Sequence, residues 1–164
     1  MGYNIQIAGF KSKVDNVGDL IAATKDMGLN CTTQLLNAQG IAGRDHIMHA
    51  TIHAIQAFHR KENIAQDLGL EICVRASGQR QISQAINLLG IKEGNLDICA
   101  VLVGCNNNLM DELGDILGQR DDSVLEPDYE ILKKMYPISD LEIQTFGSVS
   151  RVLMERTALL ILES

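Results

Sequence analysis

Tryptophan is absent from this sequence of 164 residues, two residues are proline, and aromatic residues make up 4%. So little proline excludes a collagen-like chain and a proline-rich linker. No apolar run approaches the roughly 20 residues that a membrane-spanning helix needs, and the first residues lack the basic and apolar regions of a secretory signal. We therefore expect a cytoplasmic protein that forms one domain, residues 1–164, and has no membrane partner.

The cysteines show no paired spacing. They are Cys31, Cys73, Cys99 and Cys105, and no two of them form a CxxC pair. A structural zinc site needs ligands paired at short spacing, so we expect no metal. Because disulfides are rare in the cytosol, the sequence predicts buried, reduced thiols.

The motifs of common active sites are missing as well. The sequence contains no GxGxxG or Walker phosphate loop and no GxSxG nucleophile turn. The acidic pair Asp121 and Asp122 lies in a polar stretch that is typical of a solvated turn. We therefore expect no bound cofactor, no catalytic residue and no conventional active site.

Charge is distributed unevenly along the chain. The formal net charge is -7, yet residues 1–100 carry 9 basic and 9 acidic side chains. Residues 101–164 carry 5 basic and 12 acidic side chains, which accounts for the whole net charge. Contact with a polyanion such as RNA would therefore use a local basic patch in the first part of the chain.

Apolar periodicity predicts the elements of the fold. Alternating or continuous apolar runs predict four strands, at residues 3–10, 32–37, 70–76 and 98–103. Helical spacing predicts helices at residues 14–27, 43–60, 81–89, 107–117, 128–135 and 147–162. We expect an α/β fold, with α+β as the alternative: a small, roughly four-stranded mixed or antiparallel sheet flanked by helices.

Three histidines share one side of the predicted helix 43–60. His46, His49 and His53 follow an i, i+3, i+7 spacing, which places them on a narrow arc. A polar face beside the apolar stripe is one interpretation. Contact with RNA or a partner is the second, and a metal site is the third, although an HExxH motif is absent.

The segment 75–82 carries the clearest local basic patch. It is predicted to pass from a strand, through a turn at Gly78, into the start of a helix. A helix N-terminus favours a phosphate because its backbone N–H groups are unpaired. Arg75 and Arg80 flank that position, and Gln81 offers hydrogen bonds to a base edge or ribose. A solvated loop with ordinary capping is the alternative.

Apolar residues cover nearly every side of the predicted helix 147–162. A surface helix needs only one apolar stripe, so the excess is buried either in the core or against another protein. The helix 107–117 is a second candidate for the same surface. The residues concerned are Val149, Leu153 and Leu160 in the first helix and Met110 and Leu113 in the second.

A family resemblance rests on the segment around Gly78. The run from Val74 to Ile86, VRASGQRQISQAI, followed by Leu-Gly-Ile at residues 89–91, resembles the signature of the kinase-binding small subunit of KEOPS. The eukaryotic form of that subunit is the PRPK-binding protein (TPRKB). The likeness continues into the apolar run 98–103 and the final helix, whereas segment 105–142 departs from the family pattern.

The resemblance implies a non-catalytic role. KEOPS makes threonylcarbamoyl-adenosine beside the anticodon of tRNAs that read codons beginning with A. The family's subunit binds the small lobe of the PRPK-type atypical kinase/ATPase, supports its activity and holds the tRNA 3′ CCA end. The family fold, a small sheet flanked by helices, agrees with the elements expected above.

Carried onto this sequence, the resemblance assigns two sites. The tRNA-end site comprises Lys61, Arg75, Ser77, Gly78, Arg80 and Gln81. The kinase surface is expected at the two apolar helices, through Val149, Leu153, Leu160, Met110 and Leu113. Two other functions stay open: a homo-oligomeric scaffold closed through the final helix, and a metal-dependent enzyme that uses the arc of His46, His49 and His53.

Overall fold

The central element of the computed structural model is a four-stranded antiparallel sheet. The model describes residues 4–163, with side chains up to residue 160. The strand order is β2-β3-β1-β4. The strands are β1 (Ile5–Val14), β2 (Thr32–Asn37), β3 (Gly94–Val103) and the short β4 (Gln119–Arg120). Strands β1 and β3 pair along their whole length and lie at the centre of the sheet.

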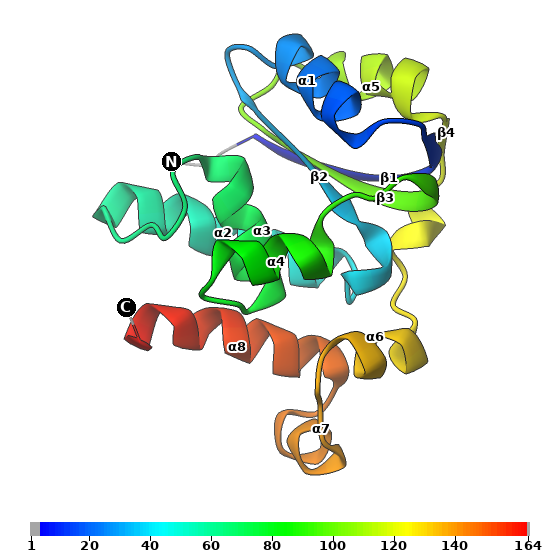
Figure 1. Cartoon of the computed structure of the whole chain (residues 1–164). Coiled ribbons are helices and arrows are strands. Elements are labelled where there is room, and N and C mark those ends of the chain that lie inside the picture. The colour runs from blue at the N-terminus through cyan, green and yellow to red at the C-terminus, as the bar shows by residue number, and fades with distance from the viewer. Residues whose placement is uncertain (1–3, 164) are drawn as a thin grey trace.

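Helices cover both faces of the sheet. They are α1 (Val17–Met27), α2 (Arg44–Arg60), α3 (Leu68–Ser77), α4 (Ile82–Leu89), α5 (Leu109–Leu117), α6 (Tyr129–Met135), α7 (Asp140–Phe146) and α8 (Val149–Glu163). Two 3-10 turns, η1 (Ala38–Gly40) and η2 (Asp122–Leu125), complete the described part. Figure 1 shows α1 and α5 above the sheet, and α2, α3, α4 and α8 below it. The expected sheet flanked by helices is confirmed.

Two hydrophobic cores lie on opposite faces of the sheet. Successive strand residues point to opposite faces, so Ile7 belongs to the core beneath α2, α3 and α8, whereas Ala8 belongs to the core beneath α1 and α5. The two helices proposed as one kinase surface are therefore separated. Leu153 of α8 packs in the first core and Leu113 of α5 in the second.

The predicted strand at residues 70–76 is wrong. These residues form helix α3, which Asp67 caps through its side chain and which Gly78 ends in a left-handed conformation. Almost every residue of α3 is buried, so its apolar run shows neither a period of 2 nor one of 3.6. The fourth strand is β4 instead. Helix α7, with a capping box between Ser139 and Glu142, was not predicted.

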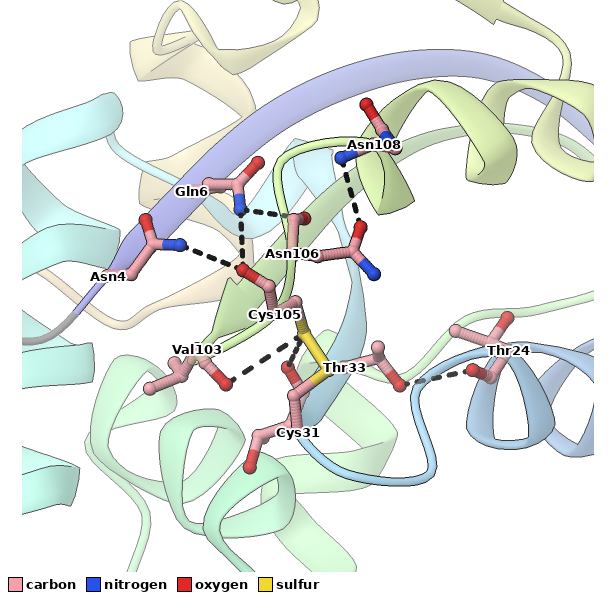
Figure 2. Close-up of a disulfide and its surroundings, with 10 residues drawn as sticks. Asn4, Gln6, Thr24, Cys31, Thr33, Val103, Cys105, Asn106 and Asn108 are labelled. Carbon is pink, nitrogen blue, oxygen red and sulfur yellow. Dashed lines mark hydrogen bonds between the residues drawn. A yellow bond between two sulfur atoms is a disulfide. The ribbon is translucent and has the colours of Figure 1, made fainter.

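The prediction of four reduced thiols is wrong for two cysteines. Cys31 and Cys105 form a disulfide, with 5.1 Å between their Cα atoms (Figure 2). The pairing of Thr32 with Val103 brings the residues that flank β2 and β3 together, which their separation of 74 residues in the chain conceals. Cys73 and Cys99 are free and buried, and burial raises the pKa of each thiol to about 12.

Within residues 4–163, no helix is both long enough and apolar enough to cross a membrane.

Candidate functional site

The turn between α3 and α4 is built by a serine and a glycine. The Ser77 hydroxyl donates to the Val74 carbonyl at 2.9 Å and accepts from the Gln79 N–H at 3.1 Å. Gly78 has φ +68° and donates its N–H to Val74. Because L-residues rarely adopt that conformation, glycine suits the position. Ser77 is buried and shapes the turn from inside.

Helix α8 supports the turn from the other side. A Cβ atom added at Gly78 would lie 3.3 Å from Arg156 Cβ, so the turn and α8 are in close contact. Arg156 donates to the Pro137 carbonyl at 2.7 Å and to Glu142 Oε2 at 2.9 Å. That hydrogen bond from Arg156 lowers the pKa of Glu142. Arg156 therefore joins the turn to α7.

Arg80 and Gln81 lie on the surface at the start of α4. Gln81 is the N-cap residue and makes no side-chain capping bond. The first helical hydrogen bond runs from the Ala85 N–H to the Gln81 carbonyl. The N–H groups that come before Ala85 in the first turn therefore have no partner within the helix. The turn thus combines the positive end of a helix with an arginine and an amide, as predicted for binding a phosphate.

Arg75 does not belong to that surface. Its side chain is 1% exposed, and its Nε donates to Glu71 Oε2 at 2.7 Å. The other oxygen of Glu71 accepts from the N–H groups of Ile64 and Ala65, at 2.8 and 2.6 Å. The pair therefore holds the α2–α3 connection. Glu71 was missed because its i, i+4 spacing from Arg75 has meaning only in a helix.

Lys61 stands at the other end of that connection. It is exposed and has φ 59°, and it caps α2 through its own N–H. The main-chain carbonyl of the next residue, Glu62, accepts a hydrogen bond from Arg75 Nη2 at 3.4 Å. From the interior, Arg75 thus helps to hold the backbone next to Lys61 in place. Lys61 itself lies in the α2–α3 connection, whereas Gly78 lies in the turn between α3 and α4.

The histidine arc divides into two parts. His46 is fully buried: its Nδ1 accepts from the Ala42 N–H at 3.0 Å, and its Nε2 therefore donates to the Ala76 carbonyl at 2.9 Å. Burial lowers its pKa to about 4. His49 and His53 instead contact each other, with 3.1 Å between their Nε2 atoms. Burial is also the main cause that lowers the pKa of His53 to about 4.

A metal site does not form from this arc. Both ring nitrogens of His46 are used by backbone groups. No group of three or more histidine, cysteine, aspartate or glutamate side chains that could hold a metal exists in the described part of the chain. The three histidines therefore do not converge on one point.

The residues expected at the kinase surface are all buried in this chain's own cores. They are Val149, Leu153 and Leu160 in α8 and Met110 and Leu113 in α5. Among the described side chains of these two helices, two large apolar ones are exposed. Leu159 of α8 is 41% exposed and Ile116 of α5 is 43% exposed.

Comparison with known proteins identifies the family. The family model described as "Kinase binding protein CGI-121" matches residues 11–160. This chain belongs to the CGI-121 family of kinase-binding proteins. It is also 35% identical over 127 residues to the "Regulatory protein Cgi121" of Methanocaldococcus jannaschii, and the match covers 77% of this chain and 81% of that relative. The resemblance found in residues 74–91 is confirmed.

Within the CGI-121 family, the shared property is binding to a kinase. The matched range includes the turn at Gly78, most residues of both cores and α8 up to residue 160, and it begins within β1. The similarity therefore extends over most of the described architecture rather than over one motif. It supports a kinase-binding regulatory role for the chain.

Proposed function

We propose that this protein is the non-catalytic, cytoplasmic subunit of the KEOPS tRNA-modifying complex that binds and supports the PRPK-type kinase/ATPase and holds the tRNA 3′ CCA end. Membership of the CGI-121 kinase-binding family is the observation that carries the proposal. The role of KEOPS in forming threonylcarbamoyl-adenosine comes from the resemblance of residues 74–91 to the KEOPS subunit.

The RNA part of the proposal uses the surface at the start of α4. Arg80 and Gln81 contact the RNA, and the N–H groups of the first turn of α4 donate hydrogen bonds to a phosphate. Ser77 and Gly78 hold the shape of the turn from beneath. With 4% aromatic residues in the chain, the planar guanidinium of Arg80 replaces an aromatic ring for stacking on a base.

Lys61 and Arg75 have different parts in this proposal. Lys61 is exposed and supplies a second positive charge to the RNA backbone. Arg75 is a positioning residue, since its buried guanidinium holds the connection that carries Lys61.

The kinase part uses the outer side of α8. Val149, Leu153 and Leu160 anchor this helix in the core, and Leu159 points a large apolar side chain outward. Contact with a partner would remove this exposed apolar side chain from water, which favours association. Leu159 is therefore the residue of α8 that we expect to contact the kinase.

Binding of tRNA with and without its CCA end tests the RNA part. The assay uses wild type and Arg80→Glu at two salt concentrations, with the purified kinase absent and then present. We expect CCA-dependent binding that Arg80→Glu weakens at least tenfold. Lys13→Glu on β1 is the control, since it makes the same change of charge at an exposed residue of another element. Equal binding of both tRNAs with the kinase present would contradict the role in holding the CCA end.

Co-elution with the kinase tests the other part. The two purified proteins, mixed and passed over a sizing column, should elute as one complex. Separate elution would contradict the kinase part while leaving the RNA measurement unaffected.

A further inference from the structure

A groove follows the outer edge of strand β2. It has a volume of about 200 Å³ and runs between α1 on one side and α3 and α4 on the other. Its lining is mostly apolar and includes Ile21, Leu35, Leu70, Ile86 and Ile91. A second hollow of about 250 Å³ shares the lining residues Lys25, Thr33 and Asp67, so the groove continues toward the start of β2.

The direction of the main-chain groups in the sheet follows from one residue of β1. Gly9 accepts from the Asp121 N–H at 2.8 Å, on the side of β1 that faces away from β3. Main-chain groups of successive strand residues alternate in direction. Ala8 therefore directs its N–H and carbonyl toward β3, where it pairs with Ala100.

The same alternation decides which groups of β2 face the groove. Since Ala100 is directed toward β1, Val101 is directed toward β2, where its partner is Gln34. Thr33 and Leu35 consequently direct their main-chain groups outward, along the edge that ends the sheet. The Leu35 carbonyl accepts a long hydrogen bond, 3.4 Å, from the side-chain amide of Gln34. Both residues line the groove.

Two isoleucines form its walls. Ile21 of α1 is 40% exposed and Ile86 of α4 is 46% exposed, although both are large and apolar. Exposed apolar residues scattered singly are normal. Here they border the same groove from opposite sides, which produces a slot with apolar walls and a polar strand edge as its floor.

An unpaired cation lies at the mouth of the slot. Lys25 of α1 is exposed and lines both hollows. Its side chain takes part in none of the ion pairs or hydrogen bonds found among residues 4–163. Across the groove, the Asp67 carboxylate accepts from the Leu70 N–H as the cap of α3. A ligand carboxylate is therefore the group that complements Lys25.

We propose that this groove binds an extended peptide segment of a partner protein as an added strand. Its main chain pairs with Thr33 and Leu35, an apolar side chain packs between Ile21 and Ile86, and an acidic side chain pairs with Lys25. Strand addition of this kind takes affinity from main-chain hydrogen bonds and specificity from alternate side chains. The surface is separate from Arg80 and Gln81, and the proposal does not depend on RNA binding.

Selection from a displayed pool of random octapeptides tests this proposal. Peptides selected on wild type should alternate apolar and polar residues and include an acidic residue. Their binding should weaken at least tenfold in Ile86→Asp and remain unchanged in Leu141→Asp, a control that changes a residue 71% exposed on α7. Lys25→Ala should weaken peptides with glutamate but not the same peptides with glutamine in its place.

Two measurements distinguish strand addition from simple apolar contact. Amide hydrogen exchange at Thr33 and Leu35 should slow when a selected peptide is bound. N-methylation of every second main-chain nitrogen of the peptide can be made in two alternating sets. The set that removes the N–H donors facing β2 should abolish binding, and the other set should not. Failure of the pool to yield a peptide sensitive to Ile86→Asp, or equal binding of N-methylated peptides, would overturn the proposal. A dimer of the free protein that Ile86→Asp dissociates would assign the groove to a second copy and overturn it too.

Discussion

The Arg75 Nε atom lies 2.7 Å from Glu71 Oε2, and both side chains are almost completely buried. Glu71 also accepts two backbone N–H groups of the α2–α3 connection. A buried ion pair contributes little relative to apolar residues of the same size, but removal of one partner leaves an uncompensated charge. Arg75, which the sequence analysis placed in the tRNA-end site, therefore has a structural role.

Loss of Arg75 should destabilise the fold. We expect Arg75→Ala to lower the free energy of unfolding by about 3–5 kcal/mol, because the Glu71 carboxylate loses its partner in the interior. Urea unfolding measures the change. The double change Glu71→Gln with Arg75→Met should lose less, because the glutamine oxygen still accepts from the Ile64 and Ala65 N–H groups and no unpaired charge remains. An equal loss in both variants would contradict the explanation.

The disulfide should stabilise the protein in the absence of reductant. We expect Cys31→Ser to lower the free energy of unfolding by about 2–4 kcal/mol, because the disulfide closes a long loop in the unfolded chain. Wild type in dithiothreitol should resemble the variant. A thiol assay of the unfolded, unreduced protein should find only Cys73 and Cys99 reactive, and reaction of all four cysteines would show that the bond is absent.

Stability should fall between pH 6.5 and pH 4. The folded-state pKa of His46 is lowered from 6.5 to about 4, so the unfolded chain binds the proton first. The contribution is complete above pH 6.5 and is lost as the pH falls toward 4, at a cost on the order of 3 kcal/mol. Urea unfolding at half-unit pH steps measures the slope.

Replacement of His46 identifies its share of that slope. His46→Gln should be less stable at pH 7, because the glutamine cannot reproduce both backbone hydrogen bonds, but its stability should change less with pH. An unchanged slope would mean that other groups, such as His53, dominate this pH range.

The turn at Gly78 should not tolerate a side chain. We expect Gly78→Ala to cost about 1–2 kcal/mol for the left-handed backbone and more for the contact with Arg156 Cβ. Gly104→Ala is a matched control, since Gly104 has φ +73° and no atom within 4 Å of the added Cβ. Thermal melting compares the two, and equal losses would remove the role of α8 in supporting the turn.

Two neighbouring leucines should separate folding from kinase binding. Leu153 is 1% exposed, so Leu153→Asp should unfold the protein at 37 °C by burying a charge. Leu159 is 41% exposed, so Leu159→Asp should keep the melting temperature within a few degrees and weaken co-elution with the kinase. Full co-elution of Leu159→Asp would move the kinase surface away from α8.

Local sequence patterns sufficed to predict the elements that have a clear period or clear end signals. The alternation in β1, the apolar run of β3 and the stripe of α2 predicted these elements within a few residues of their observed bounds. The motif around Gly78 also indicated the family correctly. These features are local, because side-chain spacing and backbone preference decide them within one segment.

Tertiary contacts account for the helix at residues 70–76, the ion-pair partner of Arg75 and the disulfide partner of Cys31. A segment buried on all sides shows no period, so packing against its neighbours selects helix over strand for α3. Once α3 is a helix, Glu71 and Arg75 share one side and turn inward. Cys31 meets Cys105 through the register of β2 and β3. Helices α5 and α8 pack in the cores on opposite faces of the sheet. Each of these features depends on contacts between segments that are distant in the sequence. The composition of a single segment therefore does not predict them.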